Sequence, residues 1–132
     1  MTLSVGEPTA AGGPETVDVT ARFFSGLADP TRLRIVELLL ERPCTVGEIV
    51  ATLGLRQARV SNALVCLKWC GYVESRREGR RMWYAVTDPR IRALVYLGHT
   101  IMADHAAALA SCTRLGAEGT PLPETQETRR EA

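Results

Sequence analysis

Two of the four cysteines in this chain, Cys66 and Cys70, lie four residues apart. If this segment is helical, the two side chains share one face, with their Cβ atoms about 5–6 Å apart. Two thiolates at that separation can bind one metal ion, because metal–sulfur bonds are about 2.3 Å long for zinc and longer for larger ions. Cysteine is also a common core residue, so the pair could instead be buried packing.

Cys112 lies far along the chain and could complete a site of three sulfurs with this pair. Sites built only from thiolates favour soft ions, so Cd(II) and Pb(II) are the first candidates. As(III), which accepts three thiolates, Zn(II) and Hg(II) are the further candidates for the bound ion. We expect Cys44 to have a structural role.

Basic side chains are concentrated in one part of the chain. The segment 56–84 carries a net charge of +5, although the whole chain has a net charge of only +1. Such a concentration is typical of a nucleic-acid interface, and a solvated arginine-rich hairpin is the alternative. The basic residues of this segment are Arg56, Arg59, Lys68, Arg76, Arg77, Arg80 and Arg81.

The length of 132 residues corresponds to one domain. The N-terminal segment lacks the basic start and apolar block of a secretion signal. No uninterrupted apolar run approaches the ~20 residues that cross a bilayer. We therefore expect a cytoplasmic protein without membrane contact, whose reduced cysteines serve metal or redox chemistry rather than disulfides.

Both ends of the chain are rich in glycine, proline and threonine. This composition predicts a disordered N-terminal arm over residues 1–15 and a disordered C-terminal tail over residues 116–132. Residues 16–115 are then the folded domain, which we expect to bind DNA and to dimerise.

The first half of the domain contains signals for three helices. Apolar residues at helical spacing predict a helix over 17–28, and Asp29-Pro30 is a typical start for a second helix, which Pro43 ends. The segment 45–48 (TVGE) is a capping box, so a third, short helix should run to Leu53.

A fourth helix follows the break at Gly54. It should run from about Gln57 to Cys70, with Val60, Leu64 and Leu67 on its buried face. Two short helices joined by a tight glycine-containing turn are typical of a helix-turn-helix.

Alternating residues over 72–77 and 80–86, around Glu78-Gly79, predict a β-hairpin. A last helix should start at Asp88-Pro89 and continue to about Cys112. Such a helix would be ~36 Å long. It is apolar nearly all round, so either a second copy of the chain or the rest of its own fold must cover it.

The expected fold class is therefore mainly α with a β-hairpin: a winged helix-turn-helix that forms a homodimer. In such a fold the N-terminal residues of the fourth helix read base edges in the major groove of double-stranded DNA, and a symmetric dimer implies an inverted-repeat operator. The candidate base-reading residues are Arg56, Gln57, Arg59, Ser61 and Asn62. In the hairpin, Arg77, Arg80 and Arg81 suit contacts to phosphates or the minor groove.

Three segments of this chain resemble the ArsR/SmtB family of metal-sensing repressors. The segment 27–35 (LADPTRLRI) resembles the opening typical of that family, and residues 60–71 (VSNALVCLKWCG) resemble its recognition helix. Glu78-Gly79-Arg80-Arg81 with Tyr84 resembles its wing. The resemblance covers roughly residues 17–115, and it implies a dimeric winged helix-turn-helix repressor that metal releases from DNA.

Within the family, the resemblance is greatest to cadmium- and lead-sensing members. These have a cysteine pair in the recognition helix and a third cysteine after the last helix, which implies Cys66, Cys70 and Cys112 as metal ligands here. A second family site grips zinc through Asp, His, His and Glu or His on the last helix. The corresponding positions here are Asp88, Arg90, Ile101 and Asp104, and we expect that site to be absent because arginine and isoleucine cannot bind zinc.

The expected function is thus a repressor that leaves its operator when a soft metal binds thiolates. A thiol redox switch or an arsenite sensor on the same fold is an alternative, as is a dimerisation module that does not bind DNA. A small thiol oxidoreductase is disfavoured, because the pair lacks the Cys-x-x-Cys spacing and no catalytic set of side chains is present. We expect the protein not to be an enzyme.

Overall fold

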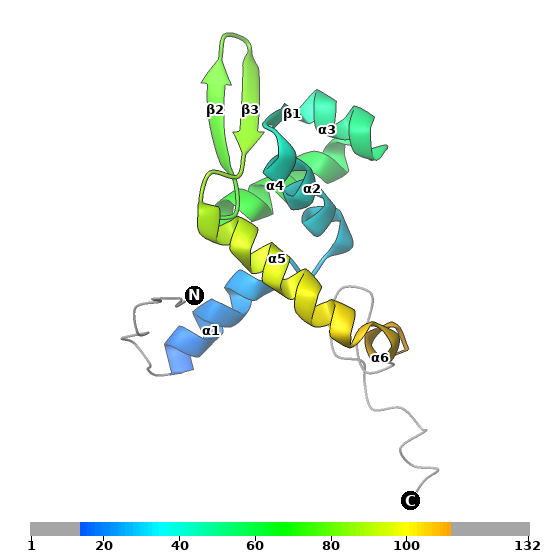
Figure 1. Ribbon diagram of the computed structural model, residues 1–132. Coiled ribbons are helices and arrows are strands. Elements are labelled where there is room, and N and C mark those ends of the chain that lie inside the picture. Colours follow the sequence, from blue (N-terminus) through cyan, green and yellow to red (C-terminus); the bar gives the residue numbers. More distant parts are fainter. Residues whose placement is uncertain (1–13, 112–132) are drawn as a thin grey trace, which may run out of the picture.

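The computed structural model describes residues 14–111. The predicted tail, Cys112 and all but the last two residues of the predicted arm lie outside the described residues. The elements are α1 (Pro14–Ser25), α2 (Pro30–Glu41), β1 (Cys44–Thr45), α3 (Val46–Leu53), α4 (Gln57–Trp69), β2 (Glu74–Glu78), β3 (Arg81–Ala85), α5 (Pro89–Asp104) and α6 (Ala106–Ala110). Figure 1 shows the hairpin of β2 and β3 at one end of the molecule and α1 and α6 at the opposite end, while α5 runs from the base of the hairpin to α6.

The starts of α2 and α3 confirm the capping signals in the sequence. The Asp29 side chain accepts a hydrogen bond from the backbone N–H of Arg32 at 3.0 Å. Thr45 Oγ1 accepts from the backbone N–H of Glu48, and Glu48 Oε1 accepts from the N–H of Thr45, both at 3.2 Å. These bonds satisfy backbone donors that a helix leaves free at its N-terminus.

Helix α4 ends one residue earlier than predicted, with Cys70 as its C-cap. Gly71 then adopts a φ of 88°, in the left-handed region that glycine tolerates best. This turn lets the backbone N–H of Tyr72 donate to the carbonyl of Leu67 at 2.9 Å, as in a Schellman motif. The C-terminus of α4 is therefore capped, and the chain continues from this cap into the wing.

The wing is a hairpin of β2 and β3, as predicted, with Gly79 at a φ of 64° in its turn. The sheet has a third strand, β1, so that the order is β1-β3-β2 with all neighbours antiparallel. Thr45 of β1 pairs with Trp83 of β3. We did not predict β1, because two residues are too few to show an alternating pattern.

The hydrophobic core lies among α2, α3, α4, the base of the wing and the first turns of α5. The predicted apolar face of α4 is confirmed, since Val60, Leu64 and Leu67 are all buried. The core residues are Ile35, Val36, Leu38, Leu39, Cys44, Ile49, Val60, Ala63, Leu64, Leu67, Tyr72, Val73, Ile91 and Val95. This core holds α4 rigidly, which fixes the presentation of its exposed N-terminal residues.

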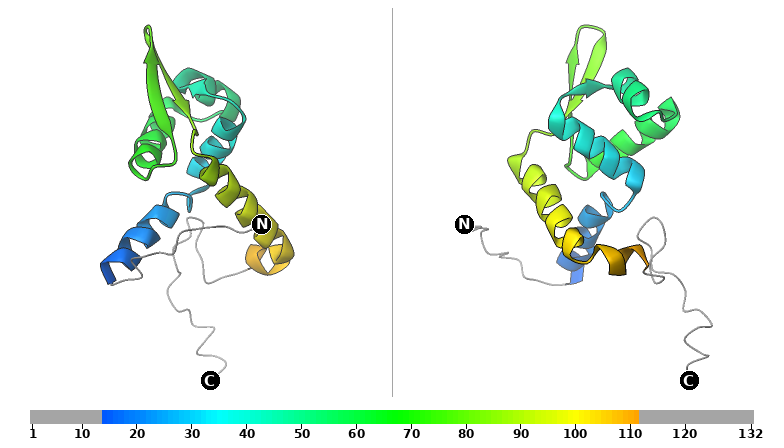
Figure 2. Two further views of the ribbon diagram at one scale, coloured as in Figure 1. Left: turned by 60° about the vertical axis from the view of Figure 1, so that its left-hand side comes forward. Right: turned by 45° about the vertical axis from the view of Figure 1, so that its right-hand side comes forward.

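Helix α1 and the end of α5 extend away from this core, as the two further views make clear (Figure 2). Helix α1 starts at Pro14, three residues earlier than predicted, and ends at Ser25 instead of Ala28. None of the helices between residues 14 and 111 is both long and apolar enough to cross a membrane.

The prediction of one continuous last helix to Cys112 was wrong. Helix α5 ends at Asp104, and non-helical His105 (φ −125°) separates it from the short α6. The 16 residues of α5 span about 24 Å, at 1.5 Å per residue, instead of the expected ~36 Å. Every residue from Tyr96 to Ser111 is exposed, so little packing within the described residues constrains this part of the chain to one straight helix.

Candidate DNA interface and thiol site

The N-terminal part of α4 presents the predicted base-reading side chains on its exposed face. Arg56 caps the helix without a side-chain hydrogen bond, and Gln57, Arg59 and Asn62 are exposed, while Ser61 is half-buried. Val60 and Leu64, on the other face of the helix, are buried in the core. One face of α4 is thus anchored and the other is free to enter a groove.

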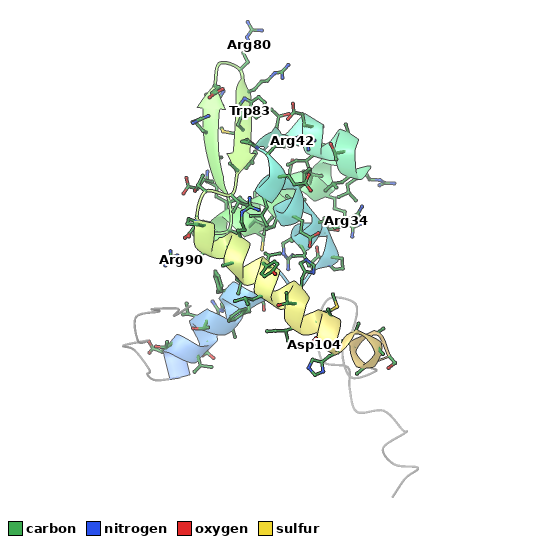
Figure 3. All side chains as sticks on the ribbon, viewed as in Figure 1. Arg34, Arg42, Arg80, Trp83, Arg90 and Asp104 are labelled. Carbon is green, nitrogen blue, oxygen red and sulfur yellow. The ribbon has the colours of Figure 1, made fainter. Side chains whose placement is uncertain are left out.

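The three predicted wing arginines, Arg77, Arg80 and Arg81, are all exposed. Arg80 lies at the tip of the hairpin, where its side chain extends away from the body (Figure 3). Arg76, which we did not include among the contacts, forms an ion pair with Glu78 at 2.8 Å. Its charge is therefore partly neutralised within the wing.

A hydrogen bond from the Lys68 Nζ to the Ser75 Oγ joins α4 to β2 at 2.6 Å. This contact helps to fix the wing relative to the recognition helix. Sequence reasoning missed it because the two residues lie on either side of the turn at Gly71, and the spacing along the chain does not show how that turn places them.

Cys66 and Cys70 are free thiols on neighbouring turns at the C-terminal end of α4, and both are half-buried. The Cys66 thiol lies close enough to Cys70 to affect the pKa of Cys70, in agreement with the four-residue spacing. Burial raises the pKa of the Cys70 thiol, and the neighbouring Cys66 raises it further, whereas the Arg32 guanidinium lowers it. Two adjacent sulfur donors that are accessible from solvent suit a soft metal ion.

The structure does not test the third predicted ligand, since Cys112 lies outside the described residues. Between residues 14 and 111, no group of three or more histidine, cysteine or acidic side chains could hold a metal ion. Within this range the thiol pair therefore lacks a third ligand.

The Cys70 sulfur faces Gly26, which lies in the turn between α1 and α2. A Cβ built on Gly26 would lie 3.1 Å from Cys70 Sγ and 2.7 Å from Cε2 of Tyr72. Tyr72 in turn donates a hydrogen bond from its hydroxyl to the carbonyl of Phe23 at 2.6 Å. Sequence reasoning did not identify Gly26 or Tyr72 as neighbours of the thiol site, because they are brought together only by long-range packing.

Cys44 is fully buried in the core, as expected of a structural residue, and its Sγ lies 3.6 Å from the carbonyl of Arg42. Burial raises the pKa of this thiol. Of the positions that correspond to the second family site, Asp88 caps α5 and pairs with Arg90 at 2.7 Å. Hydrogen bonds from the Arg90 side chain and backbone lower the pKa of Asp88 to about 2. The positive charge that balances this carboxylate is therefore the Arg90 guanidinium.

An apolar surface extends over α1 and α5 on the side opposite the wing. The exposed fraction is 53% for Phe24 in α1 and 61% for Ile101 in α5. Between the two helices is a groove of about 360 Å³, whose lining is almost entirely apolar: Phe24, Leu27, Leu33, Leu94, Val95, Gly98, His99 and Met102. At its edge His99 pairs with Glu37 of α2 at 2.5 Å.

Comparison with known proteins places this geometry in a family. A family model described as "Bacterial regulatory protein, arsR family" matches residues 29–75, which run from the start of α2 into the wing. The "Probable mercury resistance operon repressor" of Streptomyces lividans is 50% identical over 102 residues, which cover 77% of this chain and 82% of that protein. The "HTH-type transcriptional regulator CmtR" of Mycobacterium tuberculosis is 45% identical over 84 residues, covering 63% and 71% of the two chains.

A solved structure agrees with this result. The solution NMR structure of the homodimeric winged helix-turn-helix DNA-binding domain of Mb0332 from Mycobacterium bovis, a possible ArsR-family transcriptional regulator, superimposes with a TM-score of 0.65 at 32% identity. The match covers 69% of this chain and 84% of that one. Together with the observed order of helices and wing, these relatives show that the chain is a winged helix-turn-helix regulator and belongs to the arsR family of bacterial regulatory proteins.

Proposed function

We propose that this protein is a homodimeric repressor that dissociates from its operator when a soft metal ion binds to Cys66, Cys70 and Cys112. One observation carries the proposal: the thiol pair lies on the same helix whose N-terminal residues form the exposed basic face. A ligand at one end of this helix can therefore influence DNA binding at the other end.

The DNA-binding part of the proposal rests on exposure and charge. Base edges are read by Arg56, Gln57, Arg59, Ser61 and Asn62, and the wing arginines Arg77, Arg80 and Arg81 contact the backbone or the minor groove. The folded core positions the backbone of α4, and the hairpin of β2 and β3 positions the backbone of the wing, from which these side chains extend.

The apolar surface of α1 and α5 supports dimerisation. Exposed apolar patches of this kind mark protein interfaces, and the groove between α1 and α5 can accept a helix of a second copy. The Mb0332 domain is described as homodimeric. A two-fold symmetric dimer presents two copies of α4 and therefore requires an inverted-repeat operator.

The metal assignment rests on the donor chemistry of the thiols and on the named relatives. Thiolates select soft ions, so Cd(II) and Pb(II) remain the first candidates. The relative named as a mercury resistance operon repressor adds weight to Hg(II), and As(III) and Zn(II) are further candidates.

We expect Cys112 to reach the thiol pair of the partner subunit rather than its own. Helix α6, which ends two residues before Cys112, lies at the end of α5 remote from α4 in each view (Figures 1 and 2). In a two-fold dimer built on α1 and α5, the same end of α5 can approach the other copy.

Ultraviolet titration of the reduced protein with Cd(II), Pb(II), Hg(II) and arsenite tests the ligand set. Thiolate-to-metal absorption should be strong in the wild type and reduced in each of Cys66→Ser, Cys70→Ser and Cys112→Ser. Cys44→Ser is the matched control, since this fully buried thiol should not contribute.

A mobility-shift assay with the protein's own promoter fragment then measures release from DNA. Metal should weaken binding by the wild type and by Cys44→Ser only. If the three thiol variants were still released by metal, the proposed site would be wrong.

A further inference from the structure

Helix α1 is attached to the rest of the described chain mainly at its C-terminal end. Residues 15–22 are all exposed, and Phe23 is the first half-buried side chain. The Phe23 ring stacks on the Tyr72 ring with 4.7 Å between centroids. We call residues 23–26, at the end of α1 and in the turn after it, the junction. Because few other contacts hold α1, its direction depends on the contacts of this junction.

Two sets of hydrogen bonds secure the junction. The Tyr72 hydroxyl donates to the carbonyl of Phe23, and Arg32 donates to the carbonyls of Ser25 and Gly26 at 3.0 and 2.8 Å. Burial raises the pKa of Tyr72 to about 12, and the nearby Cys70 adds to this rise. The Tyr72 hydroxyl therefore remains a donor at neutral pH.

The thiol site touches the same junction. Gly26 is buried against both Cys70 Sγ and the Tyr72 ring, at distances that leave no room for even a methyl group. Cys70 and Tyr72 are also separated only by the turn at Gly71, which a backbone hydrogen bond to Leu67 closes. On its buried side the Cys70 sulfur faces Gly26 without intervening space, so a displacement of the sulfur in that direction is passed to Gly26 and Tyr72.

Helix α4 is held in place more firmly than α1. Val60, Leu64 and Leu67 hold it in the core, and Lys68 holds it to the wing. Helix α1 is held at its C-terminal end, by the stack of Phe23 on Tyr72 and by hydrogen bonds to its last carbonyls. It also carries Phe24, which lines the apolar groove proposed as the dimer contact.

We propose that Tyr72 is a positioning residue that transmits the state of the Cys66–Cys70 site to α1. This inference rests on the proposed function. On this account ligand binding at the thiols redirects α1 and thereby changes the dimer, so that the spacing of the two recognition helices no longer matches the operator. The recognition helix keeps its place within each subunit.

The test is Tyr72→Phe in the full-length protein, which removes the hydroxyl bond to Phe23 and keeps the ring. We expect unchanged Cd(II) stoichiometry and thiolate absorption, and operator affinity without metal within about twofold of the wild type. The Cd(II)-induced loss of operator affinity should be at least tenfold smaller than in the wild type. Tyr96→Phe, which removes an exposed hydroxyl from α5, is the matched control and should respond to Cd(II) like the wild type.

Hydrogen exchange of the α1 amides gives a second readout, which a merely structural role of Tyr72 would not change. Addition of Cd(II) should alter exchange in α1 of the wild type and leave it unchanged in Tyr72→Phe. Phe23→Leu, which removes the ring stack from the other side, should show the same loss of response.

Three outcomes would overturn the inference. They are a full Cd(II)-induced loss of operator affinity in Tyr72→Phe, loss of Cd(II) absorption in Tyr72→Phe, and hydrogen exchange in α1 of the wild type that does not change when Cd(II) is added. Failure of the proposed function looks different, because the wild type itself would then show no thiolate absorption or no release from DNA.

Discussion

Replacing Arg80 by alanine should weaken operator binding without changing the preferred sequence. Arg80 is exposed at the tip of the wing, far from the base-reading end of α4 (Figure 3). Contacts from such a position go to the backbone, which carries charge but little sequence information. The effect of the change should therefore be electrostatic and should depend on salt.

The size of the effect follows from counterion release. Each phosphate that a protein neutralises on duplex DNA contributes about 0.9 to the slope of log affinity against log salt concentration. A dimer loses two such contacts in Arg80→Ala, so the slope should fall in magnitude by about 1.8. Between 50 and 200 mM salt, the ratio of the operator affinity of the wild type to that of the variant should then decrease about tenfold.

Fluorescence anisotropy with a labelled operator, titrated at several salt concentrations, measures this slope. Arg90→Ala removes the same formal charge from an exposed arginine that is already paired with Asp88, so its slope should match the wild type. Arg59→Ala should behave differently, because loss of a base contact lowers affinity and relaxes specificity. An unchanged slope in Arg80→Ala, or a slope change as large in Arg90→Ala, would refute the assignment of the wing to phosphate contacts.

Three further predictions concern the site and the fold. Because burial and Cys66 raise the pKa of Cys70, this thiol is protonated at neutral pH and must lose its proton when metal binds. Cd(II) affinity measured by competition with a chelator should therefore fall as pH decreases from 8 to 6, and a pH-independent affinity would contradict thiolate ligation. Thr45→Ala removes half of the capping box and should lower the free energy of unfolding by about 1 kcal/mol in urea titrations, whereas exposed Thr87→Ala should have little effect. Ile35→Ala opens a cavity at a fully buried position and should cost about 2–5 kcal/mol, and a loss below 1 kcal/mol would show that the core is not packed as described.

Much of the fold could be predicted because its signals are local. Asp29 and the Thr45–Glu48 box start helices through bonds that span three residues. Left-handed glycines end α4 and turn the wing. The spacing of Cys66 and Cys70 likewise placed the two thiols on one face without knowledge of the rest of the chain.

Features that depend on packing could not be predicted in this way. Strand β1 exists only because β3 pairs with it, and the break at His105 has no glycine or proline to announce it. In the same way, no pattern in α1 indicated that it would be attached mainly through Phe23.

Local sequence signals were sufficient to identify the first four helices, the hairpin, the exposed basic face of α4 and the two neighbouring thiols, since each depends on residues within a few positions of one another. The contact of Cys70 with the turn after α1, and the hydrogen bond from Tyr72 to Phe23, 49 residues away, became known from the folded structure. Such contacts arise when separate helices share one core, because close packing of that core, rather than local backbone preference, selects which side chains meet.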